Sequence, residues 1–150
     1  MHKLIIYKLG PIQHCELTCS QFMTFTGFQA SGKSTIAKAI YFFRTIKNDI
    51  YSTLEDIALG LYSDSDQNKN ISKNKYLTDF LREKFLRVFG SSWGMDNDMS
   101  MEYYFSEDCF VKVYLKEENF YSTPNYVWIE LCPTITSFLY NNSLRVDALG

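Results

Sequence analysis

Nine consecutive residues have the types and the spacing needed to hold the phosphate groups of a nucleotide. They fit the pattern G-x-x-x-x-G-K-[ST], known as Walker A, and are Gly27, Phe28, Gln29, Ala30, Ser31, Gly32, Lys33, Ser34 and Thr35. The two glycines permit backbone turns that a side chain would block, so successive N–H groups can surround a phosphate. A helix beginning near Lys33 would add the positive end of its dipole.

Three side chains of the motif have distinct predicted roles in binding ATP with Mg²⁺. Lys33 is expected to reach the β- and γ-phosphates, and Thr35 to reinforce the contact with the α-phosphate. The Ser34 hydroxyl is expected to ligate Mg²⁺, which takes oxygen ligands and binds through substrate phosphates. The candidate catalytic residues are therefore Lys33 and Ser34. The alternative is a chance Gly/Ser turn before a helix.

The flanking sequence supplies the context that this motif requires. Residues 21–26 form a short, mostly apolar run that is typical of a buried strand. Apolar residues then recur at steps of three or four, on one face of a helix: Ile36, Ile40, Phe43, Ile46, Ile50, Leu54 and Ile57. We expect this helix to run from 33 to at least 47, and to extend or restart near Ser52 and Thr53.

The rest of the chain predicts strands on both sides of this unit and two more helices. Gly10 and Pro11 separate two early strands, and Gly90 is placed to end a helix. The predicted strands are 3–9, 12–19, 101–105, 109–115 and 126–131; the helices are 75–89 and, weakly, 138–149; residues 63–70 are predicted as a surface loop. The fold class predicted is α/β, a P-loop NTPase lobe with antiparallel strands before and after the Walker A strand–loop–helix, in one domain over 1–150.

Composition limits the classes of partner. The 150 residues carry a formal net charge of −2, so no global basic field attracts nucleic acid. Lys3 and Lys8 bracket an apolar run too short for a signal peptide, and no stretch is long enough to span a bilayer. We therefore expect a cytoplasmic protein without a membrane partner.

The four cysteines are interpreted as reduced, structural residues. Cys15 and Cys19 alternate with polar residues, as on the inward face of a strand, and their spacing does not match a zinc site. Cys109 and Cys132 lie in or beside predicted strands. Buried thiols behave as small apolar groups, so we favour packing over metal binding.

Two other groups of side chains have a structural and a functional interpretation. The helix over 75–89 carries Lys75, Arg82, Lys84 and Arg87. We favour a solvated face for these four, with phosphate-backbone contact as the alternative. Aromatic residues of the strand 126–131, including Trp128, are expected to pack under a neighbouring element, with base stacking as the alternative.

The sequence shows a phosphate cradle without a complete hydrolytic centre. Hydrolysis needs a carboxylate that holds Mg²⁺ and a group that orients water. Glu130, after Val127-Trp128-Ile129, and Asp147, after Arg145-Val146, are the two poor candidates for the Walker B carboxylate. No Ser-Gly-Gly run occurs in the chain.

Residues 4–12 (LIIYKLGPI) and 25–38 (FTGFQASGKSTIAK) resemble the amino-terminal lobe of SMC/RecF-type ABC ATPases. This group includes AAA-labelled bacterial ATPases of the overcoming-lysogenisation-defect and Septu-like kinds. The similarity covers residues 3 to 38 closely and the later elements in outline only. It implies that Gly27 to Thr35 bind ATP and that Gly10 and Pro11 lie near the nucleotide.

The resemblance also implies a mechanism and partners. Two such lobes dimerise head to tail around two ATP molecules, and hydrolysis reopens the dimer. The signature motif and Walker B normally lie in a carboxy-terminal lobe, so this segment alone is expected to bind nucleotide weakly and turn over little. A role in DNA repair or phage defence follows, with contacts to DNA or a nuclease made through other parts.

Two further functions remain open from the sequence. One is a small P-loop kinase acting on a metabolite, against which stand the two strands before the motif and the lack of an arginine-rich lid. The other is a non-catalytic module that senses ATP and regulates a partner by binding alone.

Overall fold

The computed structural model describes residues 2–19, 32–59, 69–90, 95–116 and 126–149, and the side chains of these except 69–72, 116, 126 and 142–149. Its elements, in chain order, are β1 (His2–Leu9), β2 (Ile12–Cys19), α1 (Lys33–Arg44), α2 (Ile46–Ala58), α3 (Lys69–Phe89), β3 (Ser100–Tyr104), β4 (Phe110–Lys116), β5 (Tyr126–Leu131) and α4 (Pro133–Leu149).

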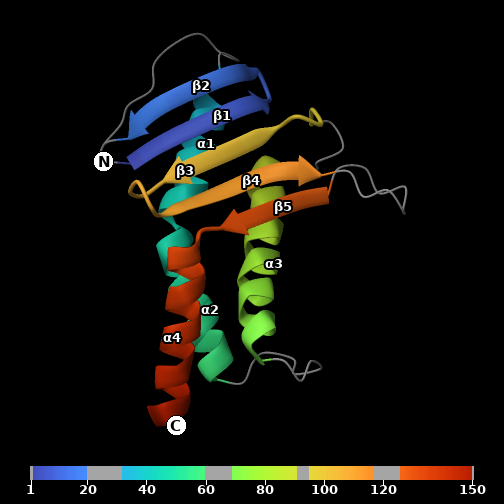
Figure 1. The fold of residues 1–150 in the computed structure, drawn as a ribbon. Coiled ribbons are helices and arrows are strands. Elements are labelled where there is room, and N and C mark those ends of the chain that lie inside the picture. Colours follow the sequence, from blue (N-terminus) through green and yellow to red (C-terminus); the bar gives the residue numbers. More distant parts are fainter. Residues whose placement is uncertain (1, 20–31, 60–68, 91–94, 117–125, 150) are drawn as a thin grey trace.

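The described strands form one five-stranded antiparallel sheet in the order β2-β1-β3-β4-β5 (Figure 1). β1 connects the two parts of the sheet, because it pairs with β2 on one side and with β3 on the other. The sheet therefore joins the strands that precede α1 to the strands that follow it. Successive side chains of a strand point to opposite faces of the sheet. In β1, Leu4 and Ile6 are fully buried, whereas Lys3 and Tyr7 are exposed.

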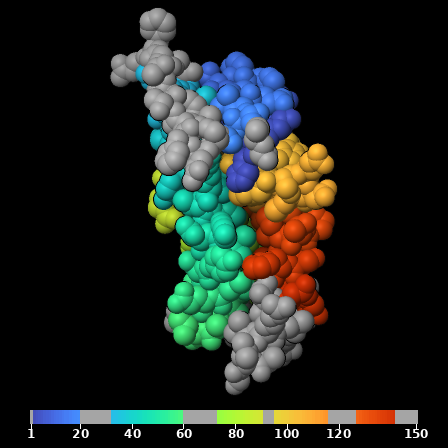
Figure 2. All heavy atoms as spheres, turned by 90° about the vertical axis from the view of Figure 1, so that its left-hand side faces the viewer, coloured from blue at the N-terminus to red at the C-terminus, as the bar shows by residue number. Residues whose placement is uncertain are grey.

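The helices cover one face of this sheet and continue past it. Figure 1 shows α1 and α3 behind the strands, while α2 and α4 extend below them. A quarter turn shows α1 and α2 on one side of the molecule and the strands on the other (Figure 2). The core lies between these layers, and its largest fully buried side chains include Tyr103, Phe42, Phe43 and Phe85. No helix in the described ranges is long and apolar enough to cross a membrane.

The predicted fold class is confirmed at the coarse level. The chain is α/β, and antiparallel strands stand before and after α1 as expected. The parallel sheet that usually carries a P-loop is not among the described pairings, all four of which are antiparallel. The predicted strand 21–26 lies outside the described residues.

The first helix ends earlier than the sequence predicted, before residue 47. α1 ends at Arg44 and α2 begins at Ile46, so the break is at Thr45 rather than near Ser52 and Thr53. The cause is a local competition for carbonyl groups. The Thr45 hydroxyl donates to the carbonyl of Tyr41 at 2.7 Å, and a lysine from α3 donates to the carbonyl of Phe42. Groups that occupy the last carbonyls of a helix favour a bend there.

Two helix beginnings also differ from the sequence prediction. α3 starts at Lys69 rather than 75, so the predicted loop 63–70 is wrong for its last two residues. α4 starts at Pro133 rather than 138, because proline is well suited to the first helical position. The end of α3 is as predicted: Gly90 follows it with φ +86°, the left-handed conformation of a C′ glycine.

The basic side of α3 is not the solvated face that the sequence favoured. Lys75 and Arg87 are exposed, but Lys84 is buried, at 4% exposure. Its ammonium donates to the Asp49 carboxylate, to the Thr45 hydroxyl and, at 3.0 Å, to the Phe42 carbonyl. Arg82 donates to the Val127 carbonyl on β5 at 2.8 Å. These two cations connect α3 to its neighbours instead of facing solvent.

Candidate functional site

The candidate site is built around the N-terminus of α1. Gly32 precedes the first helical residue and has φ +97°, a conformation that residues with a side chain rarely adopt. The carbonyl of Gly32 accepts the first helical hydrogen bond, from the N–H of Ile36 at 2.9 Å. Within the described residues, no side chain caps this end, and its first turn holds no acidic residue. Such an end favours an anion.

The turn between β1 and β2 packs directly against this helix end. A Cβ placed on Gly32 would come within 2.7 Å of the Ile12 Cγ1 atom, and one on Gly10 would lie 3.4 Å from the Thr35 hydroxyl. Gly10 is itself left-handed, with φ +56°. Gly32 therefore permits the close approach of turn and helix, whereas Gly10 is favoured there by its left-handed backbone. Gly10 therefore lies beside Thr35 of the motif, and its expected nearness to a nucleotide stays a prediction.

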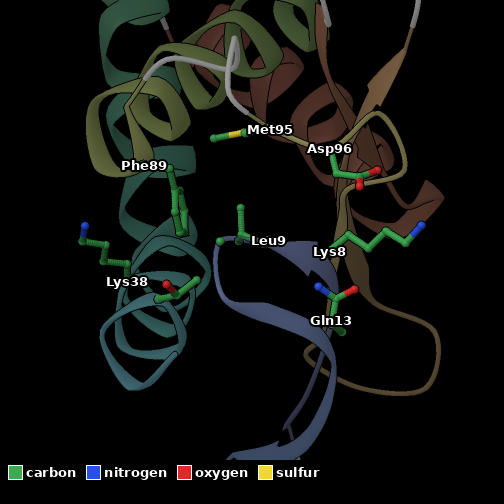
Figure 3. Close-up of a pocket in the computed structure, with 9 residues that line it drawn as sticks. Lys8, Leu9, Gln13, Lys38, Phe89, Met95 and Asp96 are labelled. Atoms are coloured by element: carbon green, nitrogen blue, oxygen red, sulfur yellow. The ribbon is translucent and has the colours of Figure 1, made fainter. Parts of the chain in front are cut away.

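A cavity of about 550 Å³ opens where the turn meets the helix (Figure 3). Its lining residues are Lys8, Leu9, Gly10, Gln13, Thr35, Lys38, Phe89, Met95 and Asp96. Leu9, Phe89 and Met95 surround the hollow, while Lys8 and Lys38 extend away from it on opposite sides (Figure 3). The lining is therefore mixed, with three apolar side chains beside polar and charged residues, and the volume lies in the range of small-molecule sites.

Backbone strain is found at the rim of this cavity. Lys8 has φ +50° and is the one non-glycine residue with positive φ in the described part of the chain. Its ammonium pairs with the Asp98 carboxylate at 3.1 Å, and this contact raises the pKa of Lys8. Asp98 is in turn positioned by a hydrogen bond from its N–H to Asp96, at 2.9 Å. Strained residues of this kind concentrate at binding sites.

The structure brings together only part of the predicted motif. Gly27, Phe28, Gln29, Ala30 and Ser31 lie outside the described residues. Of the remainder, Lys33 is half-buried, the Ser34 side chain is exposed, and Thr35 lines the cavity. The hydroxyl of Ser34 stands on the first turn of α1, which fits its predicted role as an oxygen ligand for Mg²⁺.

Sequence reasoning missed the residues that close the cavity from the far side. Phe89 ends α3, and Met95 and Asp96 precede β3, some sixty residues after the motif. No spacing rule connects them to residues 32–35, because a tertiary contact alone brings them there. The only sequence signal was Gly90, which fixed the end of α3 beside the cavity.

Neither candidate carboxylate for Walker B is placed at the helix end. Glu130 is exposed on β5, opposite Lys112, and faces away from the helices. Because Val127 and Ile129 point into the core, alternation puts Glu130 on the other face of the sheet. Asp147 lies in α4, and its side chain is outside the described part. Among the described residues, no three His, Cys, Asp or Glu side chains cluster as metal ligands.

Comparison with known proteins identifies no family for this chain. No family model matches the chain, and no curated protein or solved structure matches it significantly.

Proposed function

We propose that residues Gly27 to Thr35 bind the phosphates of ATP with Mg²⁺, and that the chain is the amino-terminal ATP-binding lobe of an SMC/RecF-like ATPase. The observation that carries the proposal is the Walker A sequence in register with α1: the last glycine of the motif is left-handed and Lys33 is the first helical residue. The motif requires this register, because its N–H groups and helix dipole must face the phosphates.

The cavity beside Thr35 supports a nucleotide rather than a free phosphate. Its apolar wall of Leu9, Phe89 and Met95 suits the flat face of a base, and Gln13 and Asp96 offer hydrogen-bonding groups at its edge. Phosphates on the helix end and a base in this cavity would occupy adjoining spaces. The turn at Gly10 would then contact the nucleotide, as the resemblance implies.

The separation of Glu130 from the helix end supports binding without efficient turnover by this segment. Hydrolysis would need a carboxylate and a water-positioning group from another lobe or another chain. A role in DNA repair or phage defence, and dimerisation through the nucleotide, follow from the SMC/RecF resemblance. The gene sequence beyond Gly150 tests the proposed SMC/RecF relationship. A downstream Ser-Gly-Gly motif, followed by an apolar strand that ends in Asp-Glu, would support it.

Replacing Lys33 tests the binding site itself. Lys33→Ala should weaken MgATP binding at least about 100-fold, because a charge-assisted contact to phosphate is lost. Binding is measured by titration calorimetry and by the rise in melting temperature with MgATP.

The matched control is Lys47→Ala, which removes the same charge from an exposed position on α2. It should bind MgATP as the wild type does. An unchanged MgATP-induced thermal shift in Lys33→Ala would overturn the assignment.

A further inference from the structure

Two of the four cysteines approach each other where the start of β4 meets the end of β5. The Sγ atoms of Cys109 and Cys132 are 3.9 Å apart, and both thiols are free. Cys109 is the last residue before β4 and is half-buried. Cys132 directly follows β5 and is fully buried. A disulfide needs sulfur atoms about 2.05 Å apart, so side-chain rotation must close roughly 2 Å.

The backbones that carry these thiols are held in place. The carbonyl of Cys109 accepts hydrogen bonds from the N–H groups of Phe105, at 2.8 Å, and Ser106, at 3.3 Å. The N–H of Cys132 donates to the Phe110 carbonyl at 3.2 Å, and its own carbonyl accepts from Ile135 and Thr136 at the start of α4. The approach of the two sulfur atoms is therefore a property of the sheet and not of a loose loop.

We propose that Cys109 and Cys132 form an oxidisable dithiol that closes to an intramolecular disulfide on reaction with a small disulfide such as glutathione disulfide. The link would join the beginning of β4 to the N-terminus of α4. This inference does not depend on nucleotide binding.

The reaction proceeds in two exchanges. The Cys109 thiolate, the more exposed of the two, attacks one sulfur of the small disulfide and releases one thiolate. Cys132 then loses its proton to water, and its sulfur attacks the Cys109 sulfur and releases the second thiolate. The protein dithiol loses two protons and two electrons, and the small disulfide takes them up to become two thiols. Burial and the neighbouring Cys132 raise the pKa of Cys109 to about 11, so the first step speeds up with pH.

The other two cysteines provide an internal control. Cys15 and Cys19 lie four residues apart on β2, which separates them by about 13 Å along an extended strand. β2 and β4 are separated by β1 and β3, so cross-pairing would have to span roughly 14 Å. The folded chain should therefore form one specific link.

The experiment treats the folded full chain with glutathione disulfide, blocks the remaining thiols with N-ethylmaleimide, and maps the peptides by mass spectrometry. We expect a peptide pair linked through Cys109 and Cys132, and a melting temperature raised by on the order of 5–10 °C that dithiothreitol reverses. Cys109→Ser should abolish both the link and the temperature rise. Cys15→Ser, also half-buried, should leave both unchanged.

Three results would overturn the inference. One is a stable glutathione adduct on Cys109 without any link to Cys132. Another is a link that involves Cys15 or Cys19 at a comparable rate. The third is a link that forms only after the chain is unfolded in urea, which would show that the folded sheet does not bring the two thiols together.

Discussion

The two ends of α1 are built in opposite ways. At the N-terminus, Gly32 offers no side chain, and no side chain from the described residues caps the helix. At the C-terminus, the carbonyls of Tyr41 and Phe42 accept hydrogen bonds from Thr45 and Lys84. The N-terminus, here called the open end, therefore has no side-chain cap from the described residues, whereas at the C-terminus, the saturated end, side chains of the protein occupy the carbonyls. From this comparison we infer that the saturated end stabilises the fold, and we propose the open end as the place where phosphate binds.

Removing Lys84 should break the saturated end and have the largest effect on stability. Lys84→Met leaves the Asp49 carboxylate, whose side chain is 14% exposed, without its partner. Breaking a buried ion pair in this way costs roughly 4 kcal/mol of unfolding free energy. Chemical denaturation of the variant measures this, and MgATP affinity should change little in the fraction that stays folded.

The control and the double variant separate charge from packing. Arg87→Met, on the exposed side of the same helix, should change stability by less than about 0.5 kcal/mol. Asp49→Leu combined with Lys84→Met should recover at least half of the loss, because no buried charge is left unpaired. If Lys84→Met costs no more than Arg87→Met, the saturated end does not stabilise the fold as we argue.

Adding a methyl group at Gly32 should damage the open end. Gly32→Ala must place a Cβ 2.7 Å from the Ile12 Cγ1 atom in a left-handed conformation. Strain and overpacking together should cost about 3 kcal/mol of stability. The turn would move from the helix end, so MgATP affinity should also fall. Both are measured by denaturation and by calorimetric titration.

Gly90→Ala is the matched comparison, because Gly90 is also left-handed but has no atom within 4 Å of its added Cβ. It should cost about 1 kcal/mol, for the backbone conformation alone. Equal losses of unfolding free energy in the Gly32 and Gly90 variants would show that the contact between the turn and α1 does not contribute to stability.

The elements of the open end could largely be predicted from the sequence, because its signals are local. The Walker A spacing predicted a helix beginning near Lys33, and α1 begins there. Residue types and period-two alternation predicted the strands on both sides of it, with bounds that differ by at most one residue. Gly10-Pro11 marked the turn that meets the helix. These signals come from residues near one another in the chain, where periodicity and turn chemistry apply.

The saturated end could not be predicted, because it is made by distant residues. The spacing of α3 places Lys84 beside the apolar stripe, three residues after Leu81, but it does not show that the buried ammonium meets Asp49. Only the packing of α3 against α1 and α2 decides which cation meets Asp49. The break at Thr45 has the same origin, since it depends partly on the hydrogen bond from Lys84. The far wall of the cavity was missed for the same reason.

The smallest expected effect is a pH dependence at His2, the first residue of β1. Burial and, next, the positive Arg44 at the end of α1 lower the pKa of His2, whose Nδ1 is 2.7 Å from the Tyr103 hydroxyl. The unfolded chain therefore binds a proton at a higher pH than the folded chain. Stability is complete above the ordinary histidine pKa of about 6.5 and falls as pH drops toward the lowered folded value.

His2→Asn should remove this part of the acid sensitivity, because asparagine does not titrate and can still accept a hydrogen bond. The control is His14→Asn, the chain's other histidine, which is exposed and stacked on Tyr7. Denaturation midpoints between pH 5 and 7.5 should flatten for His2→Asn and keep the wild-type slope for His14→Asn. A wild-type slope in His2→Asn would mean that His2 is not held against Tyr103 and Phe105, within the field of Arg44, in solution.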